Sequence, residues 1–206
     1  MINQKETLKF FPQPVLKYKV DNFKDFNEKL SSYIYKLNSE DQSGILRSNK
    51  GGWHSKPFDL KDINSIQHKF LLETTKYVFD AIKAFGWKLD PKRVICTEMW
   101  SIINKKDDFN TIHTHPNSYL SAAYYVKAPK NCGKFIVENP HSISRHSYPA
   151  LERPTEFNLN VATLEIEEGD LLLFPAYLPH GVEENRSEED RIVISFNINI
   201  NNFNLS

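Results

Sequence analysis

The sequence contains little cysteine: the 206 residues include only Cys96 and Cys132, which do not form a C-x-x-C pair. A disulfide framework or a cysteine-ligated zinc site needs several cysteines at characteristic spacings. Two isolated cysteines fit a reducing compartment, where such residues are most often small members of the core. The sequence therefore predicts neither a disulfide-stabilised scaffold nor a cysteine-bound metal.

An excess of charge of either sign is also missing, because 26 Lys and Arg residues balance 26 Asp and Glu residues. Proteins that bind nucleic acid or an anionic bilayer usually present a net positive field. We therefore expect neither nucleic acid nor a membrane as a partner.

Long hydrophobic runs are absent as well. No stretch approaches the roughly 18 apolar residues of a membrane span, and the first fourteen residues lack the basic-then-apolar layout of a signal peptide. We therefore expect a cytoplasmic protein. Its length suffices for one core and is short for two ordinary domains, so residues 1–206 are predicted to form a single domain.

The hydrophobic periodicity changes once along the chain, near Pro91. Before it, apolar residues recur at helical spacing over residues 21–37 and 62–85. After it, seven segments have the pattern of strands, separated by turn sequences such as KKDD, HPNS and EEGD. They are residues 93–103, 111–115, 120–127, 134–138, 162–166, 171–174 and 191–200. Residues 1–91 are thus expected to be a helical and loop decoration that packs on one of two antiparallel sheets formed by residues 92–200.

Two loops interrupt this pattern. Residues 48–58 are rich in Gly and polar residues, and Trp53 within them is expected to anchor the core rather than to line a pocket. Residues 139–160 form a long connection of the kind that often serves as a lid, and Arg145, His146 and Arg153 lie in it. An ordinary surface loop fits this connection equally well.

Three histidines form a candidate metal site. His113 and His115 occur in TIHTHP, and side chains two residues apart on a strand point to the same face, so both imidazoles can reach one ion. His180 ends the segment LLLFPAYLPH, where two prolines turn the chain and present the ring at the mouth of a strand. We predict that the three imidazoles bind a metal ion.

The order of these motifs resembles a known family. IHTHPNSYLSAAYYV, then CGKFIVENP, then GDLLLFPAYLPHGVEENRSEEDRIVISFN are similar to the 2-oxoglutarate/Fe(II) oxygenases of bacteria and tailed phages, which are relatives of the prolyl hydroxylases. The resemblance covers residues 92–200, with a weaker similarity in SNKGGWHS. It implies a double-stranded β-helix, or jelly roll, that uses Fe(II) and 2-oxoglutarate to hydroxylate a small-molecule or peptide substrate, releasing succinate and CO2.

The sequence departs from the superfamily at one ligand. That superfamily binds iron with two histidines and one carboxylate in the pattern H-x-D…H. His113 and His180 match the histidines, whereas His115 stands where the aspartate is expected. Either the site is a true three-histidine site or Glu138 supplies the carboxylate, and we favour three histidines because of the spacing.

The resemblance also implies a site for the cosubstrate. A dicarboxylate needs a buried cation, and the planar fork of arginine suits it. Arg191 follows the last histidine at about the family's interval and begins a strand whose same face carries the polar Ser195 and Asn197. Tyr125, the second residue of the YY pair, is similar in position to the tyrosine that assists this arginine. The alternative for Arg191 is a surface ion pair with a neighbouring acid at positions 188–190.

Two other classes of protein fit parts of the pattern. GDLLLFPAYLPHGVEEN approaches the second cupin motif, although Tyr177 replaces a glycine and Tyr119 stands where the first motif needs a glutamate. A cupin would be a metalloprotein with the same fold that does not use 2-oxoglutarate. A structural protein of a virus could keep the barrel without using the histidines.

Overall fold

The structure is a computed structural model that describes residues 11–141 and 149–201. Two helices occur in the first part of the chain, α1 (Phe23–Glu40) and α2 (Ile66–Ala84). Eleven strands make up the described sheets: β1 (Leu16–Lys19), β2 (Asn49–Lys50), β3 (Trp53–His54), β4 (Val94–Asn104), β5 (Phe109–His113), β6 (Leu120–Lys127), β7 (Phe135–Glu138), β8 (Val161–Leu164), β9 (Asp170–Pro175), β10 (His180–Val182) and β11 (Arg191–Ile200).

The strands form two antiparallel sheets, as predicted. The larger sheet has the order β1-β9-β6-β11-β4-β3, and the smaller has the order β2-β5-β10-β7-β8. Every strand pairing within the two sheets is antiparallel. The fold is the jelly roll that the sequence predicts, with the two sheets facing each other and not closed into a barrel.

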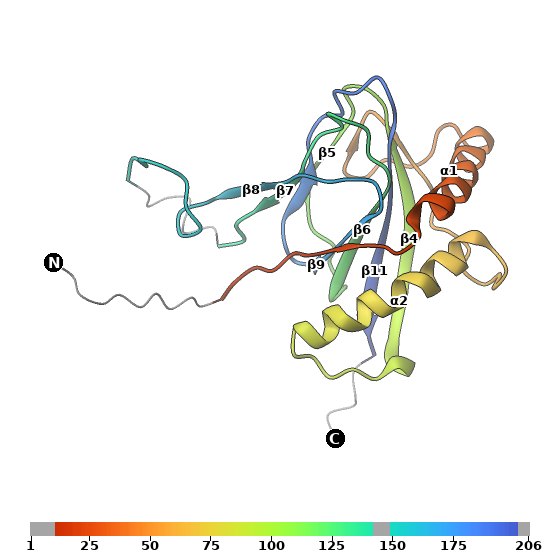
Figure 1. The fold of residues 1–206 in the computed structure, drawn as a ribbon, viewed down its shortest axis with the longest axis horizontal. Coiled ribbons are helices and arrows are strands. Elements are labelled where there is room, and N and C mark those ends of the chain that lie inside the picture. Colours follow the sequence, from red (N-terminus) through yellow and green to blue (C-terminus); the bar gives the residue numbers. More distant parts are fainter. Residues whose placement is uncertain (1–10, 142–148, 202–206) are drawn as a thin grey trace.

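Both helices cover the outer face of the larger sheet, beside β4 and β11 (Figure 1), while β7 and β8 extend to the opposite side. Each helix buries one apolar stripe there. Leu30 and Ile34 of α1 and Phe70 and Ile82 of α2 are completely buried and belong to one cluster with the outward side chains of β6 and β11. Burial of this stripe, rather than local helix propensity, is the main source of the helices' stability.

A second, smaller core lies between the sheets. It contains Tyr125 and Phe174 from the larger sheet and Phe135 from the smaller one. Tyr124 and Tyr125 show how β6 serves both cores: adjacent side chains of a strand point to opposite faces, so Tyr124 packs under the helices and Tyr125 faces the interior. Tyr124 is therefore a core residue under the helices, whereas Tyr125 borders the space between the sheets.

Several local predictions are also tested by the structure. Trp53 is buried in the core under the helices and its indole nitrogen donates to the carbonyl of Asp41, so it is an anchor, as expected. The helix expected over residues 62–85 is α2, and Gly86 follows its C-cap with a positive φ of 69°, the conformation in which glycine is favoured. The predicted strand 111–115 was displaced by two residues, because β5 begins at Phe109 and ends at His113. The strand pattern also missed β1, β2, β3 and β10.

The Tyr124 hydroxyl provides a test of the helix–sheet contact. It donates to Oδ1 of Asn27 on α1 at 2.6 Å, and both side chains are buried. We expect Tyr124→Phe to leave that amide oxygen unsatisfied and to lower the free energy of unfolding by about 1 to 3 kcal/mol. Urea denaturation measures the loss. Metal binding should not change, because the Tyr124 side chain packs under the helices and faces away from the space between the sheets. A variant as stable as the wild type would contradict the prediction.

Candidate metal centre

The three predicted histidines come together at one end of the two facing sheets. His113 is the last residue of β5 and His180 is the first residue of β10, and the two are paired across the smaller sheet. His115 lies two residues beyond the end of β5, where its backbone N–H donates to the carbonyl of Ala176. The predicted convergence of the rings is therefore correct, although His115 is held by a loop contact and His180 starts a strand instead of ending one.

Backbone carbonyls fix two of the rings. Nδ1 of His113 lies 2.7 Å from the carbonyl oxygen of Thr111, and Nδ1 of His180 lies 2.8 Å from that of Leu178. Because a carbonyl only accepts hydrogen bonds, Nδ1 carries the proton in both rings and Nε2 carries a lone pair. This is the arrangement in which a metal-binding histidine is held by a partner on its other nitrogen.

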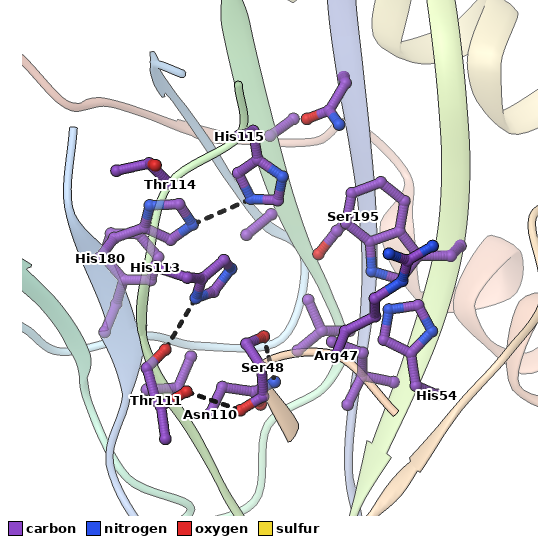
Figure 2. Close-up of a pocket in the computed structure, with 18 of the residues that line it drawn as sticks. Arg47, Ser48, His54, Asn110, Thr111, His113, Thr114, His115, His180 and Ser195 are labelled. Carbon is purple, nitrogen blue, oxygen red and sulfur yellow. Dashed lines mark hydrogen bonds between the residues drawn. The ribbon is translucent and has the colours of Figure 1, made fainter. Parts of the chain in front are cut away.

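The spacing of the ring nitrogens fits a single ion. One ligand atom from each of the three rings lies within 4.8 Å of the others, and Nε2 of His115 is 3.2 Å from Nε2 of His180. Two nitrogens bound at right angles, each about 2.1 Å from an ion, would be roughly 3 Å apart. Figure 2 shows the three rings turned toward one another.

Burial keeps these imidazoles neutral. It lowers the pKa of His115 to about 4 and, with the nearby His113 adding to the effect, that of His180 to about 3; burial also lowers the pKa of His113. The His180 ring packs against Phe135 and Phe174, with ring centroids 5.6 and 4.5 Å away. Neutral imidazoles are the form that binds a metal, so near pH 7 no proton has to leave before an ion binds.

Glu138, the alternative ligand, is not a member of this cluster. Its neighbour Val137 pairs with His180 and packs into the core between the sheets. Since side chains alternate along a strand, Glu138 on β7 points to the outer face. The geometry favours three histidines over a site completed by this carboxylate.

A cavity of about 500 Å³ opens from the histidines into the space between the sheets. The inward side chains of β4 and β11 form one wall, and Ser195 and Asn197 are among them, as the strand pattern predicted. The residues that line it include Arg47, Ser48, His54, Glu98, Trp100, Asn104, Asn110, Thr111, Tyr125 and Phe174.

Hydrogen-bond donors without partners gather around Arg191. Its side chain is completely buried, and Nη1 donates to the carbonyls of Cys132 and Glu183. Nε and Nη2, which form one edge of the guanidinium, have no partner among the described residues, and neither does the hydroxyl of Tyr125. Burial raises the pKa of Tyr125, which keeps the hydroxyl protonated, and the guanidinium acts in the opposite direction. Unpaired buried donors of this kind are costly unless a ligand completes them.

The position of Arg191 excludes the alternative prediction of a surface ion pair. The acids at positions 188–190 bind other partners: Glu188 pairs with Lys106, Glu189 with Lys127, and Asp190 accepts from Tyr35.

Arg191 does not itself line the cavity, whereas its neighbour Tyr125 does. Asn104, which pairs with Arg191 across the sheet, also lines the cavity and has a buried amide nitrogen without a described partner.

Sequence reasoning missed the wall formed by Arg47, His54 and Trp100. The rings of His54 and Trp100 stack with centroids 5.7 Å apart, and Trp100 lies 5.6 Å from the ring of His115. The signal that could have identified Trp100 is the period-two series Glu98, Trp100, Ile102 and Asn104 on β4, all of which line the cavity. In the long connection, Arg145 and His146 lie outside the described residues, and Arg153 is exposed.

Comparison with known proteins identifies the region that carries this site. Residues 98–197 match the model of a family described as "Putative 2OG-Fe(II) oxygenase", and this range contains all three histidines, Tyr125 and Arg191. No curated protein matches the sequence. Within the described part of the chain, neither helix is long and apolar enough to cross a membrane.

Several solved structures have similar folds. HygX from Streptomyces hygroscopicus with nickel and 2-oxoglutarate bound has a TM-score of 0.63 at 16% identity, over 93% of this chain and 84% of that one. A Pseudomonas putida prolyl-4-hydroxylase gives 0.65 at 12%, over 92% and 94%. A Trichoplax adhaerens prolyl hydroxylase in complex with a peptide fragment gives 0.59 at 10%, over 89% and 82%. At these identities the similarity establishes the fold.

Proposed function

Because residues 98–197 belong to a family of 2OG-Fe(II) oxygenases, we propose that His113, His115 and His180 hold the iron and that Arg191 and Tyr125 receive 2-oxoglutarate. The protein is then a 2-oxoglutarate- and Fe(II)-dependent oxygenase that hydroxylates a small-molecule or peptide substrate. A cytoplasmic location and the absence of a nucleic-acid partner remain predictions.

One observation carries the proposed cosubstrate site: the unpaired edge of the Arg191 guanidinium lies buried beside the unpaired hydroxyl of Tyr125. The Nε and Nη2 hydrogens of one guanidinium point in parallel and match the two oxygens of a carboxylate. A neutral cosubstrate could accept hydrogen bonds from these donors but would leave the positive charge of the buried guanidinium uncompensated. The distal carboxylate of 2-oxoglutarate supplies the acceptors that this part of the interior lacks.

The chain's own residues prepare the reaction in two ways. The carbonyls of Thr111 and Leu178 fix two imidazoles with Nε2 turned to the metal position, so the ligands need little rearrangement on binding. Trp100, Phe135 and Phe174 surround the histidines with apolar surface that limits the access of water. Bound Fe(II) supplies the activation of dioxygen that couples decarboxylation of 2-oxoglutarate to oxidation of a C–H bond.

An anaerobic titration tests this function. We expect Fe(II) followed by 2-oxoglutarate to give a weak visible charge-transfer band, because a 2-oxo acid that chelates the metal creates a new transition. Admission of oxygen with ascorbate should then yield succinate slowly even without a primary substrate. Binding of iron without any spectral change on addition of 2-oxoglutarate, and without succinate, would return the protein to the cupin interpretation. Absence of iron binding would favour a structural protein.

The matched family favours the oxygenase over these two alternatives. The first cupin motif requires a glutamate where Tyr119 stands, and this tyrosine is partly exposed. A structural protein would have no need for buried, unpaired donors such as those of Arg191.

A further inference from the structure

We propose that Arg47 and His54 form the substrate-binding wall of the cavity and that the primary substrate is an anion, a carboxylate or a phosphate, with an N–H or O–H donor close to its charge. This inference rests on the proposed function, because it concerns the part of the same cavity that remains for the oxidised molecule.

Arg47 brings a positive charge to the wall of the cavity. It lies in the loop between α1 and β2, and its side chain lines the cavity next to His54 (Figure 2). Among the described residues, no carboxylate forms an ion pair with its guanidinium. Arg47 is exposed at the cavity wall, and His54 beside it is buried. Burial lowers the pKa of His54, and the positive charge of Arg47 acts in the same direction. A cation of this kind at a cavity wall is available for an anionic ligand.

His54 adds a hydrogen-bond acceptor with a fixed direction to the same wall. The side chain is buried, and Nδ1 lies 2.7 Å from the carbonyl oxygen of Ser55. Since a carbonyl only accepts, Nδ1 carries the proton, and Nε2 is left with a lone pair that can accept a hydrogen bond. Stacking on Trp100 at an interplanar angle of 8° holds the ring in place. A ligand that satisfies both residues therefore combines a negative charge for Arg47 with a donor for His54.

The net charge of the cavity with iron and 2-oxoglutarate bound also favours an anionic substrate. The two positive charges of Fe(II) and the two negative charges of 2-oxoglutarate cancel, and the three imidazoles are neutral. Arg47 and Glu98 are the charged side chains that line the cavity, and Arg191 is buried behind the lining beside Tyr125. The two arginines then outweigh Glu98 by one positive charge. An aspartate at position 115 would have cancelled this charge, so the histidine there leaves a place for one anion.

Glu98 does not neutralise Arg47 locally. It lies on the same strand as Ile102, which pairs with His54, but four residues away, which corresponds to roughly 13 Å along an extended strand. No ion pair joins Glu98 to Arg47 among the described residues. Glu98 therefore lies along β4 away from His54, and Arg47 has no carboxylate partner among the described residues.

Three probes test the inference on protein loaded with stoichiometric Mn(II) and saturating 2-oxoglutarate. N-acetylglycinate has a carboxylate beside an amide N–H, N-acetylglycinamide is its neutral counterpart, and inorganic phosphate is the alternative anion. Manganese accelerates the nuclear relaxation of probe atoms that bind near it, so binding is read without turnover. We expect saturable relaxation of N-acetylglycinate or of phosphate and at least about tenfold weaker binding of the amide.

Two variants test whether Arg47 is the residue that binds the anion. Arg47→Gln should weaken binding of the anion at least about tenfold, since it removes the charge-assisted hydrogen bonds. Lys50→Gln removes the same charge from an exposed residue of β2 that does not line the cavity, and it should change the affinity less than about twofold. A response to phosphate alone identifies the anion as a phosphate, and a response to N-acetylglycinate alone identifies it as a carboxylate.

Three outcomes overturn the inference. They are measurable binding of N-acetylglycinamide that is as tight as that of N-acetylglycinate, undiminished binding of the anion to Arg47→Gln, and no binding of either anion at millimolar concentration. Loading is measured first and separately. If the wild-type protein does not take up Mn(II) and 2-oxoglutarate, the proposed function fails. If it is loaded and ignores both anions, only the substrate class is wrong.

Discussion

Replacing His113 or His180 with alanine is expected to abolish stoichiometric binding of Fe(II) or Mn(II). Both rings present Nε2 to a common position, and each is fixed there by a backbone carbonyl. Two remaining imidazoles cannot complete a facial set of three ligands, and the protein-bound ion would have to replace the lost one with water. Equilibrium dialysis followed by metal analysis measures the stoichiometry directly.

Glu138→Gln is the matched control for the ligand set. It removes the only carboxylate that the sequence offered as a replacement for the missing aspartate, and it changes the side chain's shape very little. We expect metal binding to stay close to one ion per chain, because Glu138 is not in the histidine cluster. If Glu138→Gln is the variant that loses the metal, then the three-histidine assignment is wrong.

Arg191→Gln is expected to have the second large effect, on 2-oxoglutarate alone. The bound metal should remain, because Arg191 is not among the ligands. The distal carboxylate would lose its charge-assisted fork inside the protein, and deleting one partner of such a pair costs on the order of 2 to 5 kcal/mol. The dissociation constant should then rise between roughly thirtyfold and several thousandfold. Titration of Mn(II)-loaded protein with 2-oxoglutarate by calorimetry measures this change.

Tyr125→Phe should weaken the same binding more mildly. Only one neutral hydrogen bond is lost, which corresponds to roughly 0.5 to 1.5 kcal/mol. Tyr124→Phe is its natural control, because the two tyrosines are adjacent on β6 and face opposite cores. Equal 2-oxoglutarate binding by the wild type and Arg191→Gln would remove Arg191 from the site. A larger loss in Tyr125→Phe than in Arg191→Gln would reverse the assigned roles.

The sequence predicted the long strands best. The pattern with period two placed β6 and β11 at their observed bounds, because both are long enough to show alternation on two differently packed faces. β2, β3 and β10 contain two or three residues each, too few for a period to appear. β1 was missed for another reason: Lys17 and Lys19 make it look solvated, whereas both pair with the buried Asp170 on β9.

The candidate site was predictable where it depends on local chain geometry. The same-face spacing of His113 and His115 is a local property, and it led to the correct cluster even though β5 ends before His115. Arg47 and His54 depend instead on how a loop folds against strands that follow about fifty residues later in the sequence. No periodicity in that loop indicates which side chains enter the cavity, so only the tertiary structure could identify them.

The place of β11 in the larger sheet has a consequence for the order in which the site is assembled. β11 is the last strand in the described sequence, yet it lies between β6 and β4, which are synthesised much earlier. A nascent chain that has reached β10 already contains all three histidines but lacks the strand that separates β4 from β6. It also lacks Arg191 and the polar wall of the cavity. During synthesis the metal ligands are therefore made first, and the proposed 2-oxoglutarate clamp arrives only with the strand that completes the sheet.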